Sequence, residues 1–337
     1  MKQFVTFGEL MLSLGTTGNH RLVQSETFTA HYVGAEANVA VSLAHFGVEA
    51  YEVSKVPSHE IGQACINALR RYGVRTEYIL RGGDRLGLLY KETGASQRPT
   101  KVIYDRTHSA IRQIAPGEID WDAIFAGKDW FHISGSSVAL GPEVVAVIAP
   151  ALAAAKRAGL TVSCDCNYRR KLWSMEQAGK VLSRLLENID VFICGRDDPH
   201  TIFGIPRDGL DGLAGRHRDQ RAAELMLERF RLDSLAMTVR EGISASVNGL
   251  SALLCRHGKT YFSPRYEMQM VDRVGSGDAF AAGLIFGLMS EFEPQRAVDF
   301  ATAAACLKHS IPGDCNLSSR EEVEQLVAGG ESGRVQR

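Results

Sequence analysis

No stretch of this 337-residue chain has the composition of a membrane span or an export signal. No apolar run approaches the ~20 residues that a membrane-spanning helix needs. The first nine residues read as a β-strand that ends in a turn, and they lack the apolar core and small-residue cleavage site of a signal peptide. We therefore expect a cytoplasmic protein without a membrane partner.

The chain also lacks any long block of charge of one sign. Its 38 basic and 39 acidic residues give a net charge of −1, with 45% apolar and 23% charged residues. This composition is ordinary for a globular domain, whereas a nucleic-acid-binding surface needs clustered Lys and Arg. We expect small-molecule ligands and no nucleic acid.

The cysteines show no disulfide or metal pattern, because their number is odd and no C-x-x-C pair exists. They are Cys65, Cys164, Cys166, Cys194, Cys255, Cys306 and Cys315. Cys164 and Cys166 could in principle bind a metal, but no second pair matches them. Buried thiols in a reducing compartment are the favoured interpretation.

Two common nucleotide-binding motifs are absent as well. Gly258-Lys259-Thr260 resembles the end of a Walker A loop, but Leu253 stands where its first glycine is required, so a hairpin turn is the better interpretation. Phe280 occupies the last glycine position of a G-x-G-x-x-G pattern, which excludes a dinucleotide fingerprint there.

A glycine loop at residues 272–278 is the most informative segment that is present. It reads D-R-V-G-S-G-D and runs into small apolar residues typical of a buried helix. Glycines let backbone N–H groups turn inward, and a helix start adds unpaired N–H groups and a positive dipole end. Such a loop predicts a phosphate site, in which Asp278 would accept the proton of an attacking hydroxyl. The alternative is an ordinary loop with an Asp cap.

Strand-like and helical patterns alternate over most of the length. Strands are expected at residues 50–56, 130–133, 161–165, 190–194 and 235–239, and helices at 61–72, 144–158, 175–186 and 222–230. The alternation favours an α/β fold, a doubly wound and mostly parallel sheet with helices on both faces. Ligands of such sheets bind beyond the carboxyl ends of the strands.

Residues 12–33 and 78–104 interrupt this alternation with short strand-like runs, and we expect them to pair as a small β-sheet lid. Residues 207–219 are rich in Gly, Asp and Arg and read as an exposed loop. Residues 1–330 are expected to form one domain, followed by a tail at 331–337.

Several polar residues stand where a ligand would bind. Gly34 would admit a ligand close to the backbone, and Asn38 lies one turn later, unless this is a helix start with an incidental Asn. Tyr104 and Arg106 share a face and suit a hydroxylated acid, unless they lie on a solvated edge strand. Residues 165–171 place an acid, an amide and three cations just past a strand.

These motifs resemble the ribokinase-like (PfkB-type) carbohydrate kinases over nearly the whole chain. Residues 33–47 look like the family's first signature and 271–283 like its second, about 240 residues further on. Within the family the chain is most similar to the 2-keto-3-deoxygluconate kinases. The segments that carry this likeness are Gly8-Glu9, residues 34–38, Tyr104-x-Arg106, Asp165-x-Asn167-x-Arg169 and Gly313-Asp314.

The resemblance implies a Rossmann-like body with a β-lid that often dimerises, so a homo-oligomer is expected. It also implies ATP and Mg²⁺ as cofactors and transfer of the γ-phosphoryl group to the 6-hydroxyl of a sugar acid. Asp278 would be the base, and the amides of Gly275, Ser276 and Gly277 would form the anion hole. The implied sugar-acid residues are Gly34, Asn38, Tyr104, Arg106, Arg169 and Asp314. The implied ATP residues are Asp198, Thr238, Arg240 and Gly242, with Asp198 holding the metal through water.

Some positions depart from the family pattern. An Asn-x-x-Glu motif that often follows the strand at 190–194 is replaced here by Gly195-Arg196-Asp197-Asp198. Gly195 offers no side chain, so metal use could be weakened, or Arg196 could bind a phosphate instead. Leu89 stands where a lid tyrosine is expected, which leaves the substrate open. The alternatives are a kinase for a neutral ketose or ribose, and a sugar-acid-binding protein with weakened catalysis.

Overall fold

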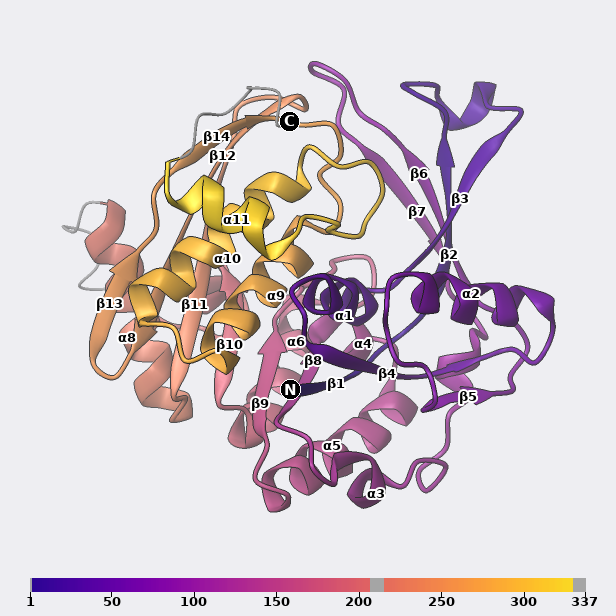
Figure 1. The fold of residues 1–337 in the computed structure, drawn as a ribbon, viewed down its shortest axis with the longest axis horizontal. Helices are drawn as coiled ribbons and strands as arrows, with labels where there is room; N and C mark the ends of the chain where they lie inside the picture. The colour runs from indigo at the N-terminus through magenta and orange to yellow at the C-terminus, as the bar shows by residue number, and fades with distance from the viewer. Residues whose placement is uncertain (1, 207–214, 330–337) are drawn as a thin grey trace.

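A mixed sheet of ten strands forms the centre of the computed structural model, which describes residues 2–206 and 215–329 (Figure 1). Its strands are β1 (Gln3–Phe7), β4 (Glu49–Val56), β5 (Ile79–Arg81), β8 (Trp130–Ser134), β9 (Thr161–Asp165), β10 (Val191–Gly195), β11 (Ser234–Gly242), β12 (Val247–Arg256), β13 (Lys259–Phe262) and β14 (Tyr266–Gln269). They follow the order β13-β12-β11-β10-β9-β8-β1-β4-β5, with β14 also paired to β12.

Pairing is parallel from β11 to β5 and antiparallel among β11, β12, β13 and β14. This confirms the predicted α/β fold with a mostly parallel sheet. The Gly258 turn joins β12 to β13 as a hairpin, which confirms the interpretation of the Walker-like segment.

Helices cover both faces of this sheet. One face carries α1 (Ala35–His45), α2 (Glu60–Arg71), α9 (Ser276–Met289), α10 (Pro294–Lys308) and α11 (Arg320–Val327). The other carries α3 (Trp121–Phe125), α4 (Gly135–Val138), α5 (Pro142–Arg157), α6 (Met175–Leu185), α7 (Asp198–Thr201) and α8 (Gly215–Phe230). Short 3₁₀ turns lie at Leu22–Gln24, Ala110–Gln113 and Leu186–Asn188.

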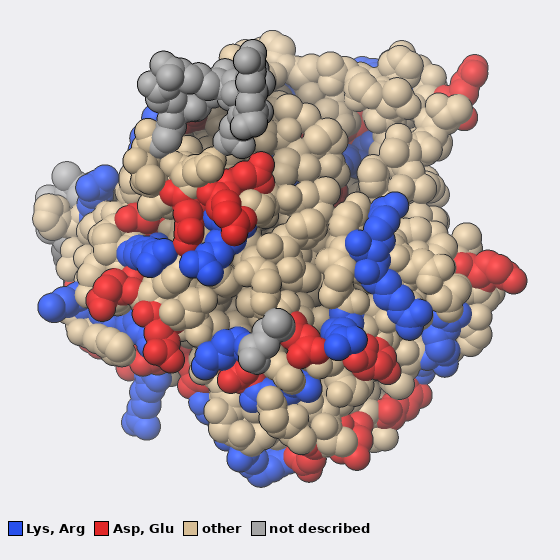
Figure 2. All heavy atoms as spheres, viewed as in Figure 1, with Lys and Arg blue, Asp and Glu red and all other residues tan. Residues whose placement is uncertain are grey.

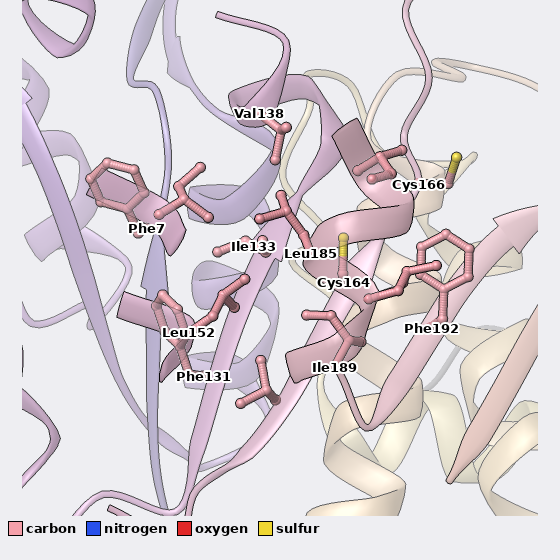
Figure 3. Packing of buried hydrophobic residues seen from close by; sticks show 14 of the residues in the cluster. Phe7, Phe131, Ile133, Val138, Leu152, Cys164, Cys166, Leu185, Ile189 and Phe192 are labelled. Atoms are coloured by element: carbon pink, nitrogen blue, oxygen red, sulfur yellow. The ribbon is translucent and has the colours of Figure 1, made fainter. Parts of the chain in front are cut away.

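Alternate residues of the central strands enter the two helical layers. On β10, Val191 and Ile193 pack against one layer, while Phe192 and Cys194 pack against the other. Figure 3 shows Phe192 among the buried side chains of its layer. Because side chains alternate along a strand and both faces are covered, these strands are buried on both faces and mostly apolar.

A second sheet rises from the body at the upper right of Figure 1. Its order is β3-β2-β6-β7, with bounds β2 (Met11–Thr16), β3 (Phe28–Val33), β6 (Gly87–Glu92) and β7 (Lys101–Asp105). The predicted small β-sheet is therefore present, with one correction. β5 falls inside the range 78–104 assigned to the lid, but it pairs in parallel with β4 in the main sheet. The crossover through α2 makes this a β-α-β unit rather than part of a hairpin sheet.

The predicted loop at residues 207–219 is wrong where the structure describes it. Residues 215–219 form the first turns of α8, while 207–214 lie outside the described residues. A polar, charged segment can be an exposed helical turn as well as a loop, and composition alone does not separate the two. The predicted tail at 331–337 also lies outside the described residues. No helix within 2–206 and 215–329 is long and apolar enough to cross a bilayer.

Candidate active site

A cavity of about 730 Å³ lies at the carboxyl ends of the central strands. The ends of β9, β10 and β11, the start of α9 and the inner face of β7 line it. This is the edge at which ligands bind in open α/β sheets, and the volume suits a nucleotide together with a small second substrate.

The glycine loop forms the floor of this cavity. Gly275 has φ +81°, and a Cβ placed on it would lie 1.8 Å from the carbonyl oxygen of Asp314. Only glycine fits both the backbone angle and the close approach. The helix α9 then begins at Ser276, so its first amides have no partner within the helix. The loop therefore presents N–H donors that can bind an anion.

Asp278 lies in the first turn of α9 and faces this cavity, with 7% of its surface exposed. Burial raises the pKa of its carboxyl group to about 7, although the hydrogen bond from Asn38 and the charge of Arg169 act in the opposite direction. The Asn38 amide donates to Asp278 Oδ2 at 2.7 Å. A carboxylate with a pKa near neutrality can take a proton from a hydroxyl and release it again.

Three arginines, Arg169, Arg240 and Arg273, gather around the loop. Arg240 Nη2 lies 3.3 Å from a Cβ placed on Gly277. Burial, followed by the charges of Arg273 and Arg169, lowers the pKa of Arg240. Within the described part of the chain, none of the three guanidinium groups forms an ion pair with a carboxylate. Unpaired guanidinium groups held together near a helix start suit anionic groups, either the phosphates of a nucleotide or the carboxylate of a second substrate.

Two carboxylates at the opposite wall could support a metal ion. Burial raises the pKa of Asp165 to about 6 and also raises that of Asp198. One oxygen of each is used by a backbone amide, since Asn167 N donates to Asp165 at 2.9 Å and Gly195 N to Asp198 at 2.7 Å. No group of three or more His, Cys, Asp or Glu suited to a metal occurs among the described residues. The donor set fits Mg²⁺ that keeps water and nucleotide oxygens as most of its ligands.

The structure brings some of the predicted site residues to the cavity wall and places others behind it. Besides the loop, Asp278, Arg169 and Arg240, the wall includes Tyr104, Asp198 and Thr238. Gly34 instead lets the backbone at the start of α1 pass close to the backbone of Glu9, because a Cβ at position 34 would lie 2.4 Å from the Glu9 carbonyl oxygen. Gly242 ends β11 opposite Asn248, away from the residues that line this cavity.

Arg106 departs from the prediction that it offers a free cation. Its guanidinium forms a buried ion pair with Glu9 and lies 5.4 Å from the centre of the Tyr104 ring. Ser109 donates a second hydrogen bond to Glu9 at 2.6 Å. Sequence reasoning placed Tyr104 and Arg106 on one face, which the ring contact confirms, but it could not show that an acid 97 residues earlier neutralises the arginine.

Arg196 lines the cavity, but its Nε is paired with Asp219 Oδ1 at 2.8 Å. Arg240 and Arg273 are therefore better placed than Arg196 to bind a phosphate. Arg273 was missed although it lies inside the loop motif. Lys91 and Lys308 were missed as well, since one resembles an ordinary strand residue and the other the basic last turn of a helix.

Comparisons with known proteins agree with this geometry. The family model of the pfkB family carbohydrate kinases matches residues 1–320. A crystal structure of 2-dehydro-3-deoxygluconokinase from Thermotoga maritima is 45% identical with a TM-score of 0.94, covering 98% of this chain and all of that one. The 2-dehydro-3-deoxygalactonokinase of Haloferax volcanii is 31% identical over 332 residues, 98% of each protein.

A 5-dehydro-2-deoxygluconokinase of Geobacillus kaustophilus is 26% identical over 331 residues, covering 96% of this chain and 93% of that protein. All of these proteins are named as sugar-acid kinases. The family match over residues 1–320, both signatures and the fold of the described residues thus agree. The protein belongs to the PfkB family of carbohydrate kinases, enzymes that use ATP to phosphorylate a sugar.

Proposed function

We propose that this kinase phosphorylates the 6-hydroxyl of 2-keto-3-deoxygluconate, the sugar acid also called 2-dehydro-3-deoxygluconate. The observation that carries the proposal is the position of Arg169. Its unpaired guanidinium lines the same cavity as Asp278 and acts on the pKa of that carboxyl group. A sugar that brings its own carboxylate would pair with this cation, whereas a neutral sugar would leave it unpaired.

Asp278 is the proposed general base. Bound ATP supplies the phosphoryl group. Asp278 accepts the proton of the sugar hydroxyl as that oxygen attacks, and the Asn38 amide fixes the carboxylate toward the helix start. The amides of Gly275, Ser276 and Gly277 stabilise the negative charge that develops on the transferred group.

The remaining residues divide between the two substrates. Tyr104, held by the Arg106–Glu9 pair, presents its phenol to the sugar acid, and Gly34 and Asp314 support the walls from behind. For the nucleotide, Thr238 and Arg240 line the cavity where the phosphates of ATP would bind. Gly242 is the last residue of the same strand, β11. Asp198 is the proposed outer ligand of Mg²⁺, through water, because one of its oxygens is already held by Gly195.

The outer face of the lid supports a proposed homodimer. Phe28 and Ile103 are 40% and 42% exposed, and Phe28 packs edge-on against Tyr90 at 6.4 Å between ring centres. The upper-right region of Figure 2, where the lid lies, is mostly uncharged, while blue and red atoms are interspersed elsewhere on the visible face. An apolar sheet face of this kind is suited to a second copy of itself.

The protein is also proposed to function in the cytoplasm, because its seven cysteines are free thiols and thiols stay reduced in that compartment.

The proposal is tested by measuring ATP consumption against a panel of sugars. The panel contains 2-keto-3-deoxygluconate, its galactonate epimer, fructose and ribose, each with and without Mg²⁺. We expect kcat/KM to be highest for a sugar acid and to fall sharply without Mg²⁺. A higher kcat/KM for fructose or ribose would overturn the substrate assignment, while leaving membership of the kinase family unaffected.

A further inference from the structure

Two buried lysines lie directly behind the glycine loop, outside the cavity itself. Lys308, at the end of α10, has no exposed surface, and Lys91, on lid strand β6, is 5% exposed. A buried ammonium group is costly unless charges or hydrogen bonds compensate it. Neither residue has a role in the proposed chemistry, so their partners indicate what they do.

Lys308 is held by two backbone carbonyl groups, one at the start of the glycine loop and one just after α10. Its Nζ donates to the carbonyl oxygen of Asp272 at 3.3 Å and to that of Ile311 at 3.1 Å. Burial lowers its pKa, and the negative charges of Asp272 and Asp314 limit that decrease. Its side chain therefore joins the first residue of the loop to the segment after α10.

Lys91 joins the lid to the same two segments. Its Nζ lies 2.7 Å from Asp272 Oδ2 and 3.2 Å from Asp314 Oδ1. Burial alone would lower its pKa, but Asp314 and Asp272 outweigh burial and raise it. The two lysines and two aspartates carry a net formal charge of zero. The cluster therefore acts on the loop by fixing the positions of its backbone atoms, not by adding net charge near the phosphate site.

Asp272 transmits this geometry to the loop. Its Oδ1 accepts a hydrogen bond from Val274 N at 3.2 Å, and its Oδ2 accepts one from Gly313 N at 3.1 Å. The carbonyl of Asp314 then sets the position of Gly275, because the two are in close contact. Any shift of the 311–314 segment must therefore displace the anion hole.

We propose that Lys91 and Lys308, together with Asp272 and Asp314, are positioning residues that hold the phosphate-binding loop in its active geometry. Lys91 makes the lid sheet part of that arrangement. This inference rests on the proposed role of Gly275 and its neighbours as the anion hole. A displacement of about 1 Å at a reacting centre can reduce a rate by about 10²-fold, so the expected effect is on turnover.

The test compares Lys308→Met and Lys91→Met with Lys55→Met in the full-length protein. Lys55 is a matched control, since its Nζ also donates to a carbonyl, Gln113 O at 3.0 Å, and to a carboxylate, Glu118 at 2.7 Å, in a different part of the fold. The acceptor is whichever sugar the wild-type enzyme phosphorylates. We expect kcat to fall about 10- to 100-fold in the first two variants, with the acceptor KM within about twofold.

Lys91→Arg, which keeps the charge, should retain more of the wild-type kcat than Lys91→Met. Lys55→Met should keep the wild-type kcat, even if it lowers the Tm as much as Lys308→Met and Lys91→Met do. The inference is overturned if Lys308→Met and Lys91→Met keep the wild-type kcat, or if Lys55→Met loses turnover to the same extent. Gly275→Ala shows which of the two hypotheses has failed. If Gly275→Ala lowers kcat but the lysine variants do not, only the positioning role is wrong. If Gly275→Ala also leaves kcat unchanged, the loop itself is not the anion hole.

Discussion

The side-chain amide of Asn38 donates a 2.7 Å hydrogen bond to the carboxylate of Asp278, across 240 positions of sequence. Each residue lies in the first turns of a helix, Asn38 on α1 and Asp278 on α9. The two helices pack on the same face of the sheet, within one hydrophobic cluster. This hydrogen bond therefore links the two family signatures, commits one lone pair of the base and fixes its orientation.

Replacing the base gives the first prediction. Asp278→Asn keeps the size of the side chain but cannot accept the proton, so kcat should fall about 10²- to 10⁴-fold. Steady-state kinetics measures this, with Asp122→Asn, an exposed carboxylate 76% accessible, as the control. For the wild type, kcat/KM should fall as the pH drops through about 7, because it reports ionisation of the free enzyme, in which the pKa of Asp278 is raised to that value. A rate that stays constant from pH 8 to 5.5 would contradict the assignment.

Glu36 provides a prediction on stability. It accepts hydrogen bonds from Ser134 N and Oγ, and burial raises the pKa of its carboxyl group from 4.5 to about 7. The folded state thus binds this proton more tightly than the unfolded state does. The stability that the protonated group contributes is complete below about pH 4.5 and is lost as pH rises to about 7.

Glu36→Gln removes this titration. Relative to the variant, the wild type should lose up to ~3 kcal/mol of unfolding free energy between pH 4.5 and 7, and no more above that. Urea unfolding at several pH values measures the difference. The exposed Glu228→Gln should show no such trend. An equal pH dependence in wild type and Glu36→Gln would show that folding does not raise the pKa of Glu36.

Gly275→Ala tests the loop geometry. The added Cβ meets the Asp314 carbonyl oxygen at 1.8 Å, in a backbone conformation that alanine disfavours. We expect kcat to fall at least about 10²-fold as the loop shifts. The control is Gly258→Ala, which has a comparable φ of +71° but open space around it. If both variants lose the same activity, backbone strain in general, rather than the anion hole, would be responsible.

Arg169 and Arg106 should differ in how their replacement affects binding of a substrate that carries a carboxylate. Arg169→Gln should raise KM for the sugar acid about 10- to 100-fold, the equivalent of one charged hydrogen-bonding partner. A neutral sugar of the same length should be much less affected. Arg106→Gln should reduce the Tm as well, because it leaves Glu9 buried without its cation. Equal loss for charged and neutral substrates in Arg169→Gln would contradict its role.

The lid interface is tested with Ile103→Asp. A charge on the outer lid face should convert a dimer to a monomer, as measured by light scattering after gel filtration. Ile61→Asp is the matched control, because Ile61 is 44% exposed on α2 and Ile103 is 42% exposed on β7. A wild-type protein that is monomeric at micromolar concentration would exclude this interface.

Periodicity and glycine placement were sufficient to predict the α/β architecture, the separate lid and the helix that begins after Gly275. Pairings between distant segments were not predictable in this way. Nothing in the local sequence of Arg106 shows that Glu9 neutralises it, and nothing around Lys308 shows that its ammonium enters the interior. β5 was assigned to the wrong sheet because a three-residue strand carries too little pattern to identify its partner.

The close packing of α9 against α10 has a consequence for how the enzyme can move. A Cβ on Gly283 would lie 2.7 Å from the Cα of Ala301, so the two backbones are almost in contact and cannot slide past each other. The base on α9 can therefore shift only together with α10. A rearrangement that repositions Asp278 has to move both helices as one unit.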